Sequence, residues 1–359
     1  MAARPGAGTP ARPASGTDRA GSVPTPVAAS LLVVIAAAFW QTAAGRSSTD
    51  AETQHPAAHP PGPRTVAALP FPDPRQGERA SVTDGTVIII GGAEDKIRDR
   101  VILNRFVSLA GGRDATIVVI ATASSLGTEA GERYRQIFTD LGVGTVRPLH
   151  ATTRPQANDE TAALALRDAT GVFLTGGNQL KLASTIGGTR LADAMLERFR
   201  HGAVMAGTSA GASAMSSHMI AFGASGATPK HRMAQIAAGL GMLPGVIVDQ
   251  HFQQRNRLGR LLSLIAQNPS LLGLGVDEDT AGVVGPDHVM EVIGRGSITV
   301  VDGAASETDA WEIRGHKPLM ISGVVLHSLP AGYRFDLRRR HRLATPTLHA
   351  LPGGEVASG

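Results

Sequence analysis

The sequence predicts an α/β fold of three layers: a mostly parallel central sheet, helices on both of its faces, and an antiparallel extension near the C-terminus. The first observation behind this prediction is that short, apolar, β-branched runs alternate with segments of helical periodicity. Such alternation is typical of parallel strands joined by crossover helices. The second observation is that after Leu272 the apolar runs come closer together, separated by turns without long helices, which favours antiparallel pairing.

Four apolar runs predict buried strands, because continuous apolar runs are typical of strands that are covered on both faces. They occupy residues 86–90, 116–121, 171–175 and 203–206. Residues 95–109 and 180–199 lie between these runs and repeat apolar side chains at helical spacing, which predicts two long helices. A further helix is expected over residues 210–220, directly after the fourth strand.

Later apolar runs predict the remaining strands. One run covers residues 245–251 and becomes polar at its carboxyl end. Four shorter runs predict an antiparallel extension of the same sheet, at residues 274–276, 281–284, 297–301 and 324–329. There is no internal repeat, and nothing divides residues 82–345 into two domains.

The N-terminal segment is interpreted as lying outside the fold. Residues 27–39, VAASLLVVIAAAF, carry no charge and are shorter than the roughly 20 apolar residues of a membrane span, as in a signal peptide. An uncleaved anchor and a mis-assigned start are the alternatives. The segment predicts export to the periplasm or the cell exterior, with membrane contact only through an uncleaved N-terminus. The expected parts are a disordered leader with this signal-like or anchor segment, a Pro-rich linker, one folded domain and a flexible tail, over residues 1–45, 46–81, 82–345 and 346–359.

The composition excludes several classes of function. The net charge is +4, aromatic residues make up 4%, and the basic residues are scattered, which disfavours nucleic acid as a partner. The absence of cysteine excludes disulfides, thiolate zinc sites and a cysteine nucleophile. The sequence contains neither H-E-x-x-H nor G-x-x-x-x-G-K-S/T, and its glycine pair at residues 91–92 lacks the other glycines of a dinucleotide fingerprint. We therefore expect no metal and no organic cofactor.

A candidate nucleophile lies in the stretch Gly207-Thr-Ser-Ala-Gly211, which matches G-x-S-x-G. In a strand-to-helix elbow this motif projects the serine hydroxyl from the carboxyl end of the sheet. The predicted strand at 203–206 and the predicted helix at 210–220 supply that context for Ser209. The alternative is a chance match in a chain rich in alanine and glycine.

A serine nucleophile at neutral pH needs a base and an orienting carboxylate. His251 ends the strand-like run 245–251, where parallel α/β folds place ligands, although a structural strand-end histidine would occupy the same position. The acid is expected among Asp277, Glu278 and Asp279. Because alternate strand side chains point to opposite faces, either Glu278 or the aspartate pair faces the site.

Five sequence blocks carry a close resemblance to the cyanophycinases, a branch of the serine peptidase family that also contains aspartyl dipeptidases. They are Gly91-Gly-Ala-Glu-Asp95, Thr175-Gly-Gly-Asn-Gln179, Gly207-Thr-Ser-Ala-Gly-Ala-Ser213, Asp249-Gln-His-Phe-Gln-Gln-Arg-Asn-Arg-Leu-Gly-Arg-Leu261 and Gly275-Val-Asp-Glu-Asp-Thr-Ala281. They span essentially the whole predicted domain. The fourth block is the most specific, because the dipeptidase branch shares the serine elbow without it.

The resemblance implies roles for particular residues. Ser209 would be the nucleophile, His251 the base and Glu278 the carboxylate. The family's pocket residues map onto Gln179, Asp249, Gln250, Arg255 and Arg260. For the oxyanion we expect donors at the backbone N–H of Ala210 and in the turn that contains Gly177 and Asn178.

The arginines after His251 are candidate ligands for a substrate carboxylate. In a helix that starts near Phe252, Arg257 and Arg260 would share a face, whereas Arg255 would lie about 160° from Arg257. Two arginines on one face can bind a carboxylate through bidentate hydrogen bonds; the alternative is that they form internal salt bridges. Side-chain arginines of a substrate would need acidic partners, for which Asp249, Asp277 and Asp279 are candidates.

The resemblance implies cyanophycin as the substrate, a polyaspartate backbone that carries an arginine on each β-carboxyl group. The expected activity is that of a serine exopeptidase that forms an acyl-enzyme and releases β-Asp-Arg dipeptides. The resemblance also implies a homodimer. Two alternatives are an aspartyl dipeptidase-like enzyme that acts on short peptides and a protein that binds the polymer without catalysis.

Overall fold

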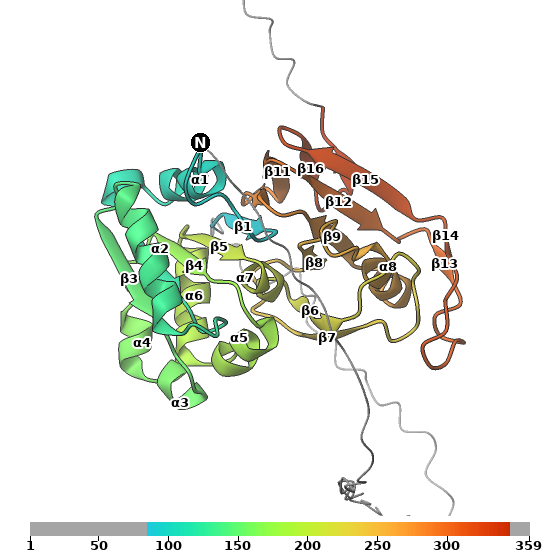
Figure 1. Cartoon of the computed structure of the whole chain (residues 1–359), viewed down its shortest axis with the longest axis horizontal. Coiled ribbons are helices and arrows are strands. Elements are labelled where there is room, and N and C mark those ends of the chain that lie inside the picture. The colour runs from blue at the N-terminus through green and yellow to red at the C-terminus, as the bar shows by residue number, and fades with distance from the viewer. Residues whose placement is uncertain (1–84, 345–359) are drawn as a thin grey trace, which may run out of the picture. The chain divides into compact units, whose positions relative to one another are not determined.

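A nine-stranded sheet forms the centre of the computed structural model, which describes residues 85–344 (Figure 1). All of these residues belong to one compact unit. The predicted leader, linker and tail lie outside the described residues, as do residues 82–84 and 345 of the predicted domain. Within residues 85–344 no helix has the length and apolar character to cross a membrane.

The central sheet is parallel on one side and antiparallel on the other. Its strand order is β17-β16-β11-β10-β1-β5-β4-β2-β3. From β1 to β3 all neighbours pair in parallel, and from β1 to β17 all pair antiparallel. The strands are β1 Val87–Ile90, β2 Thr116–Ile120, β3 Thr145–Leu149, β4 Gly171–Leu174, β5 Val204–Thr208, β10 Thr280–Val284, β11 Val289–Gly294, β16 Arg334–Asp336 and β17 His341–Arg342.

Helices cover both faces of the parallel half, which explains the unbroken apolar runs of its strands. In β1, Ile88 and Ile90 face the cluster under α1 and α2, whereas Val87 and Ile89 face the cluster under α5, α6 and α7. This is the two-residue alternation of a strand with no solvent-exposed side. The helices are α1 Val101–Leu109, η1 Gly112–Asp114 (3-10), α2 Thr128–Asp140, α3 Arg154–Ala157, α4 Glu160–Leu164, α5 Gln179–Ile186, α6 Arg190–Arg200, α7 Ala210–Ala214 and α8 Leu258–Gln267.

A second sheet of four strands, in the order β15-β12-β9-β8 within the described residues, packs beside α7 and carries α8 on its other face (Figure 1). Its strands β8 and β9 are parallel, whereas β9, β12 and β15 pair antiparallel. Two hairpins, β6–β7 and β13–β14, complete the fold. The bounds are β6 His218–Gly223, β7 Ala234–Ala238, β8 Val246–Gln250, β9 Leu272–Val276, β12 Ser297–Asp302, β13 Glu307–Thr308, β14 Ile321–Ser322 and β15 Val325–Pro330.

The predicted fold class is confirmed: the central sheet is mostly parallel, it is sandwiched by helices, and antiparallel strands follow near the C-terminus. The antiparallel extension holds for β10, β11, β16 and β17. The other late strands do not extend this sheet as expected. The strands β9, β12 and β15 instead form the second sheet, in which β9 pairs with β8, the strand that ends just before the candidate histidine.

Four predicted helices have different bounds in the structure. The helix expected from residue 95 begins at Val101, because the Asp95 carboxylate accepts the N–H groups of residues 97–100 and holds them in a turn. The helix expected over residues 180–199 is two helices, α5 and α6, separated at Gly187-Gly188. The helix over 210–220 ends at Ala214 and gives way to β6, and the helix expected near Phe252 begins only at Leu258.

Phe173 lies at the centre of an aromatic cluster, and we expect its removal to be costly. It is fully buried, with ring centroids of Tyr134, Phe138 and Phe106 at 4.6, 5.2 and 5.6 Å. Phe173→Ala should lower the free energy of unfolding by about 3–5 kcal/mol in urea titrations followed by circular dichroism. Trp311→Ala, at a side chain that is 74% exposed, should change it by less than about 0.5 kcal/mol. Equal losses would contradict this core.

Candidate active site

Ser209 lies in a sharp turn between β5 and α7. Its backbone has φ 53° and ψ −111°, a conformation that is strained for a residue with a side chain. Small neighbours make this turn possible, because a Cβ at Gly207 would lie only 2.5 Å from the carbonyl carbon of Gly211. The sequence therefore forms a strand-to-helix elbow here, with the serine hydroxyl at the carboxyl end of the parallel strands.

Ser209, His251 and Glu278 form a continuous chain of hydrogen bonds. His251 Nε2 lies 2.9 Å from Ser209 Oγ, and His251 Nδ1 lies 2.6 Å from Glu278 Oε1. Because a carboxylate only accepts, Nδ1 carries the proton and donates to Glu278, which leaves the lone pair of Nε2 directed at the serine hydroxyl. The arrangement can transfer a proton from the serine to the imidazole. Of the two acidic arrangements that strand alternation left open, Glu278 is the one that contacts the histidine.

Three consecutive backbone carbonyls at the end of β1 accept hydrogen bonds from the segments that carry Ser209, His251 and Glu278. The carbonyls of residues 90, 91 and 92 accept, in that order, the backbone N–H groups of Ser209 (2.9 Å), His251 (2.8 Å) and Asp279 (2.9 Å). The side chain at residue 92 must be absent as well, because a Cβ at Gly92 would overlap the imidazole of His251. The glycine pair at residues 91–92 belongs to the first block of the resemblance, but the sequence did not predict its role in holding the three segments.

Two of the three predicted oxyanion donors are available. The backbone N–H groups of Ala210 and Gly177 have no acceptor among the residues that the structure describes. The prediction for Asn178 is wrong for its backbone, because its N–H donates to the carbonyl of Ala123 at 3.0 Å. The Asn178 side chain instead caps α5 by accepting the N–H of Lys181.

Two of the acidic residues that were expected to bind substrate arginines are engaged within the fold. Asp277 is buried, accepts the N–H of Gln253, and accepts both the N–H and the hydroxyl of Ser297. Asp279 pairs with Arg295 at 3.2 Å. Their carboxylates fix the loops on either side of Glu278 and are not free for a ligand.

Asp249 and two of the predicted substrate-binding arginines form a buried ion cluster. Arg260 donates to both carboxylate oxygens of Asp249, and Arg257 donates to the carbonyl of Gln250 and pairs weakly with Asp249. Each of the three charged side chains is less than 10% exposed. Burial lowers the pKa of Arg257 to about 10, so it stays charged at neutral pH. The structure thus has the internal salt bridges that the sequence left as the alternative for Arg257 and Arg260.

The other three predicted substrate-binding residues are Arg255, Gln250 and Gln179, and only Gln250 contacts the serine. Arg255 is exposed, and within residues 85–344 its guanidinium makes no hydrogen bond or ion pair. Gln250 is buried and its Oε1 lies 3.3 Å from Ser209 Oγ. Gln179 donates to the carbonyls of Ile220 and Ala221, and so ties α5 to β6.

Comparison with known proteins decides the family. Residues 87–292 match the sequence profile of Peptidase family S51. The chain is 42% identical over 259 residues to a cyanophycinase of Geminocystis herdmanii, covering 72% of this chain and 95% of that protein. The chain belongs to peptidase family S51. A cyanophycinase of Trichormus variabilis is also 42% identical, over 271 residues that cover 75% of this chain and 90% of the relative.

A solved structure shares the fold of this S51 peptidase. The crystal structure of a peptidase from an acI-B1 Actinobacterium covers 71% of this chain and 98% of its own, with a TM-score of 0.53 and 21% sequence identity. At that identity the likeness concerns the fold alone. The predicted membership in a family of serine peptidases is confirmed by the family match.

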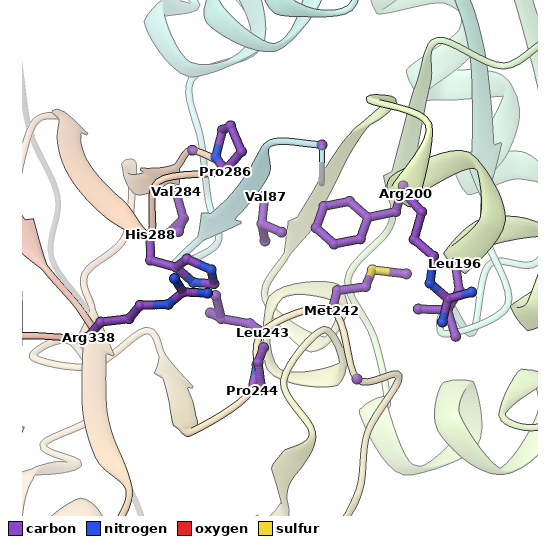
Figure 2. Close-up of a pocket in the computed structure, with 14 residues that line it drawn as sticks. Val87, Leu196, Arg200, Met242, Leu243, Pro244, Val284, Pro286, His288 and Arg338 are labelled. Carbon is purple, nitrogen blue, oxygen red and sulfur yellow. The ribbon is translucent and has the colours of Figure 1, made fainter. Parts of the chain in front are cut away.

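A hollow in this S51 peptidase lies where β1 begins and β10 ends, at the end of these strands opposite to the end that carries Ser209. It has a volume of about 260 Å³, and Figure 2 shows Arg200 and Arg338 on opposite sides of it, with Val87 and Leu243 between them. It contains no residue of the serine site.

Within residues 85–344 no group of three or more His, Asp or Glu side chains is arranged to hold a metal ion.

Burial lowers the pKa of His251 below its usual value, because a desolvated imidazolium is disfavoured. Its hydrogen bond to Glu278 acts in the opposite direction and raises the pKa, whereas the nearby positive charge of Arg255 lowers it further. The neutral imidazole that can accept a proton therefore predominates at neutral pH and persists below it.

We expect two substitutions to move the pKa of His251 in opposite directions. Arg255→Gln removes a repelling positive charge and should raise the pKa, whereas Glu278→Gln removes the attracting negative charge and should lower it. NMR titration of the histidine ring resonances measures both. Arg113→Gln, at an exposed arginine in η1, is the control and should leave the pKa unchanged. A shift of the same sign in both site variants would contradict the electrostatic assignment.

Proposed function

We propose that this S51 peptidase is a serine exopeptidase that hydrolyses cyanophycin, multi-L-arginyl-poly-L-aspartate, and releases β-Asp-Arg dipeptides. The observation that carries the proposal is the hydrogen-bonded chain Ser209–His251–Glu278 at a strand-to-helix elbow. It occurs in a chain that is 42% identical to cyanophycinases over at least 90% of their length. Proteins that similar over nearly their full length commonly share chemistry, and the elbow supplies the nucleophile.

In the acylation step Ser209 Oγ attacks a backbone carbonyl carbon of the polymer while His251 Nε2 takes the hydroxyl proton. Glu278 stabilises the imidazolium that forms. The negative charge on the carbonyl oxygen is stabilised by the N–H groups of Ala210 and Gly177, a contribution of about 3–4 kcal/mol per donor in serine proteases. The C–N bond then breaks, and the imidazolium gives its proton to the leaving amine.

Water resolves the acyl-enzyme by the same route in reverse. His251 takes a proton from the water, the resulting hydroxide attacks the ester carbon, and the bond to Ser209 Oγ breaks. The proton returns to the serine and the dipeptide leaves as its carboxylate. No metal or organic cofactor takes part in either step.

Arg255 is the residue that we assign to substrate binding by ionic contact. Each arginine of the polymer is joined through its α-amino group, so its α-carboxylate is free to bind a guanidinium. The side chain of Arg255 is exposed and, within residues 85–344, unpaired. Arg255 follows His251 by four residues and donates its backbone N–H to the His251 carbonyl, which holds it close to the base. Gln250, beside Ser209, is placed to orient the scissile amide.

Export, a homodimer and the division of the chain at residues 45, 81 and 345 are further parts of this proposal. The uncharged apolar run at residues 27–39, followed by a Pro-rich segment, supports a signal-like or anchor segment before the peptidase domain. Size-exclusion chromatography of the purified protein and N-terminal sequencing of the secreted protein test these parts separately from catalysis.

The proposed activity predicts that the purified full chain clears a suspension of insoluble cyanophycin. Turbidity should fall and mass spectrometry should identify β-Asp-Arg, because hydrolysis at each aspartate liberates one dipeptide. Ser209→Ala should lose the activity by a factor of about 10⁴ or more, as serine nucleophiles do. A folded sample that leaves the polymer intact, or that cleaves only short Asp-containing peptides, would refute the substrate assignment.

Arg255→Gln should lower kcat/KM on the polymer by about 10- to 100-fold, since a charge-assisted hydrogen bond contributes about 1.5–3 kcal/mol. Most of the loss should appear in KM if Arg255 binds the carboxylate equally in ground and transition states. Arg113→Gln is the matched control on the same polymer and should retain the rate. An unchanged KM for Arg255→Gln would remove this residue from the binding site.

A further inference from the structure

A buried carboxylate outside the Ser209–His251–Glu278 chain of hydrogen bonds contacts the residue that precedes the nucleophile. Glu94 is 3% exposed and belongs to the block Gly91-Gly-Ala-Glu-Asp95. Its Oε2 accepts the hydroxyl of Thr208 at 2.6 Å, and its Oε1 accepts the hydroxyl of Tyr134 at 2.5 Å and pairs with Lys96 Nζ at 2.9 Å. Both oxygens are therefore engaged by donors from three different segments of the chain.

These partners hold the Glu94 carboxylate in one position. An unpaired buried charge is unfavourable by several kcal/mol, so the ammonium of Lys96 and two hydroxyl donors are the groups that make Glu94 tolerable at this depth. Burial and the adjacent Glu94 charge raise the pKa of Tyr134 well above its usual value, which keeps the phenol protonated as a donor. The lysine also lies 5.5 Å over the Tyr134 ring.

Thr208 connects this carboxylate to the reacting atom. It is the last residue of β5 and immediately precedes Ser209, whose backbone is strained at φ 53°. The Ser209 N–H is held by the Ile90 carbonyl, and the Thr208 side chain is held by Glu94 four residues further along the same loop. The elbow is thus attached to one segment, residues 90–94, both at its strained residue and at the residue before it.

We infer that Glu94 is a positioning residue for the reaction: through the Thr208 hydroxyl its carboxylate fixes the elbow so that Ser209 Oγ stays within reach of His251 and the oxyanion donors. This inference rests on the proposed role of Ser209 as the nucleophile. Displacement of a reacting atom by about 1 Å can lower a rate by about 100-fold. Loss of the Glu94–Thr208 hydrogen bond therefore lowers kcat while it leaves Arg255, the residue assigned to polymer binding, in place.

The test compares Thr208→Val, which removes only the hydroxyl from a side chain of nearly the same shape, with Thr208→Ser, which keeps it. On a soluble cyanophycin oligomer Thr208→Val should lower kcat by about 10- to 100-fold at nearly constant KM. Thr208→Ser should recover most of that loss. Glu94→Gln, which replaces one acceptor by a donor facing a hydroxyl, should lower kcat in the same way.

Thr189→Val is the matched control for a merely structural effect. Thr189 is also buried and its hydroxyl also donates to one acceptor, the Ile186 carbonyl at 2.5 Å, at the start of α6. It should lower Tm without lowering kcat per folded molecule. If Thr208→Val behaves like Thr189→Val, with a lower Tm and an unchanged kcat, the positioning role of Glu94 is refuted.

A second readout separates this inference from the substrate assignment. The rate at which a phosphonate ester labels Ser209 reports the reactivity of the serine without any polymer. Labelling should slow in Thr208→Val and Glu94→Gln by a factor similar to the loss in kcat. If the wild-type protein is labelled but leaves cyanophycin intact, the proposed substrate fails and the labelling series still decides the role of Glu94. Unchanged labelling in both variants would overturn it.

Discussion

The site depends on one short run of backbone at the end of β1, whose three successive carbonyls accept N–H groups from the serine, histidine and carboxylate segments. These segments are far apart in sequence and come from β5, β8 and the loop between β9 and β10. Strand β1 pairs with both β5 and β10, in a register that places Ile90 beside the last residue of β5 and the second residue of β10. A backbone ladder thus determines the distances between side chains that react.

The same three hydrogen bonds also account for backbone strain at the three residues that donate them. Ser209, His251 and Asp279 all have positive φ, at 53°, 47° and 49°, although none is glycine. Such conformations cost on the order of 1–3 kcal/mol each and persist only where surrounding structure enforces them. Here each strained residue donates its N–H to a carbonyl of residues 90–92. The fold thereby turns the ends of three segments toward a common point.

Much of this was predictable from the sequence, because the signals are local. Apolar runs and G-x-S-x-G indicated the strands and the elbow, and the chain position of His251 indicated its place at the edge of a sheet. Contacts between distant segments were not predictable. Nothing local shows that Asp249 is neutralised by Arg260, that the Asn178 N–H is taken by Ala123, or that β8 leaves the central sheet. The helix expected at Phe252 failed because the residues after His251 form a turn that fixes the histidine.

The use of main-chain carbonyls to hold the reacting segments has a consequence for how such a site can change. Substitution alters side chains and leaves carbonyls in place, so the frame around Ser209 is insensitive to most changes at the rim. Arg255 and other exposed side chains there can be exchanged without moving the frame. Positions closed to larger side chains are the glycines of the frame itself, such as residues 91 and 92, where a Cβ would meet Asp277 or His251, and Gly207 in the elbow. New substrate preferences can therefore arise at this site while its chemistry stays the same.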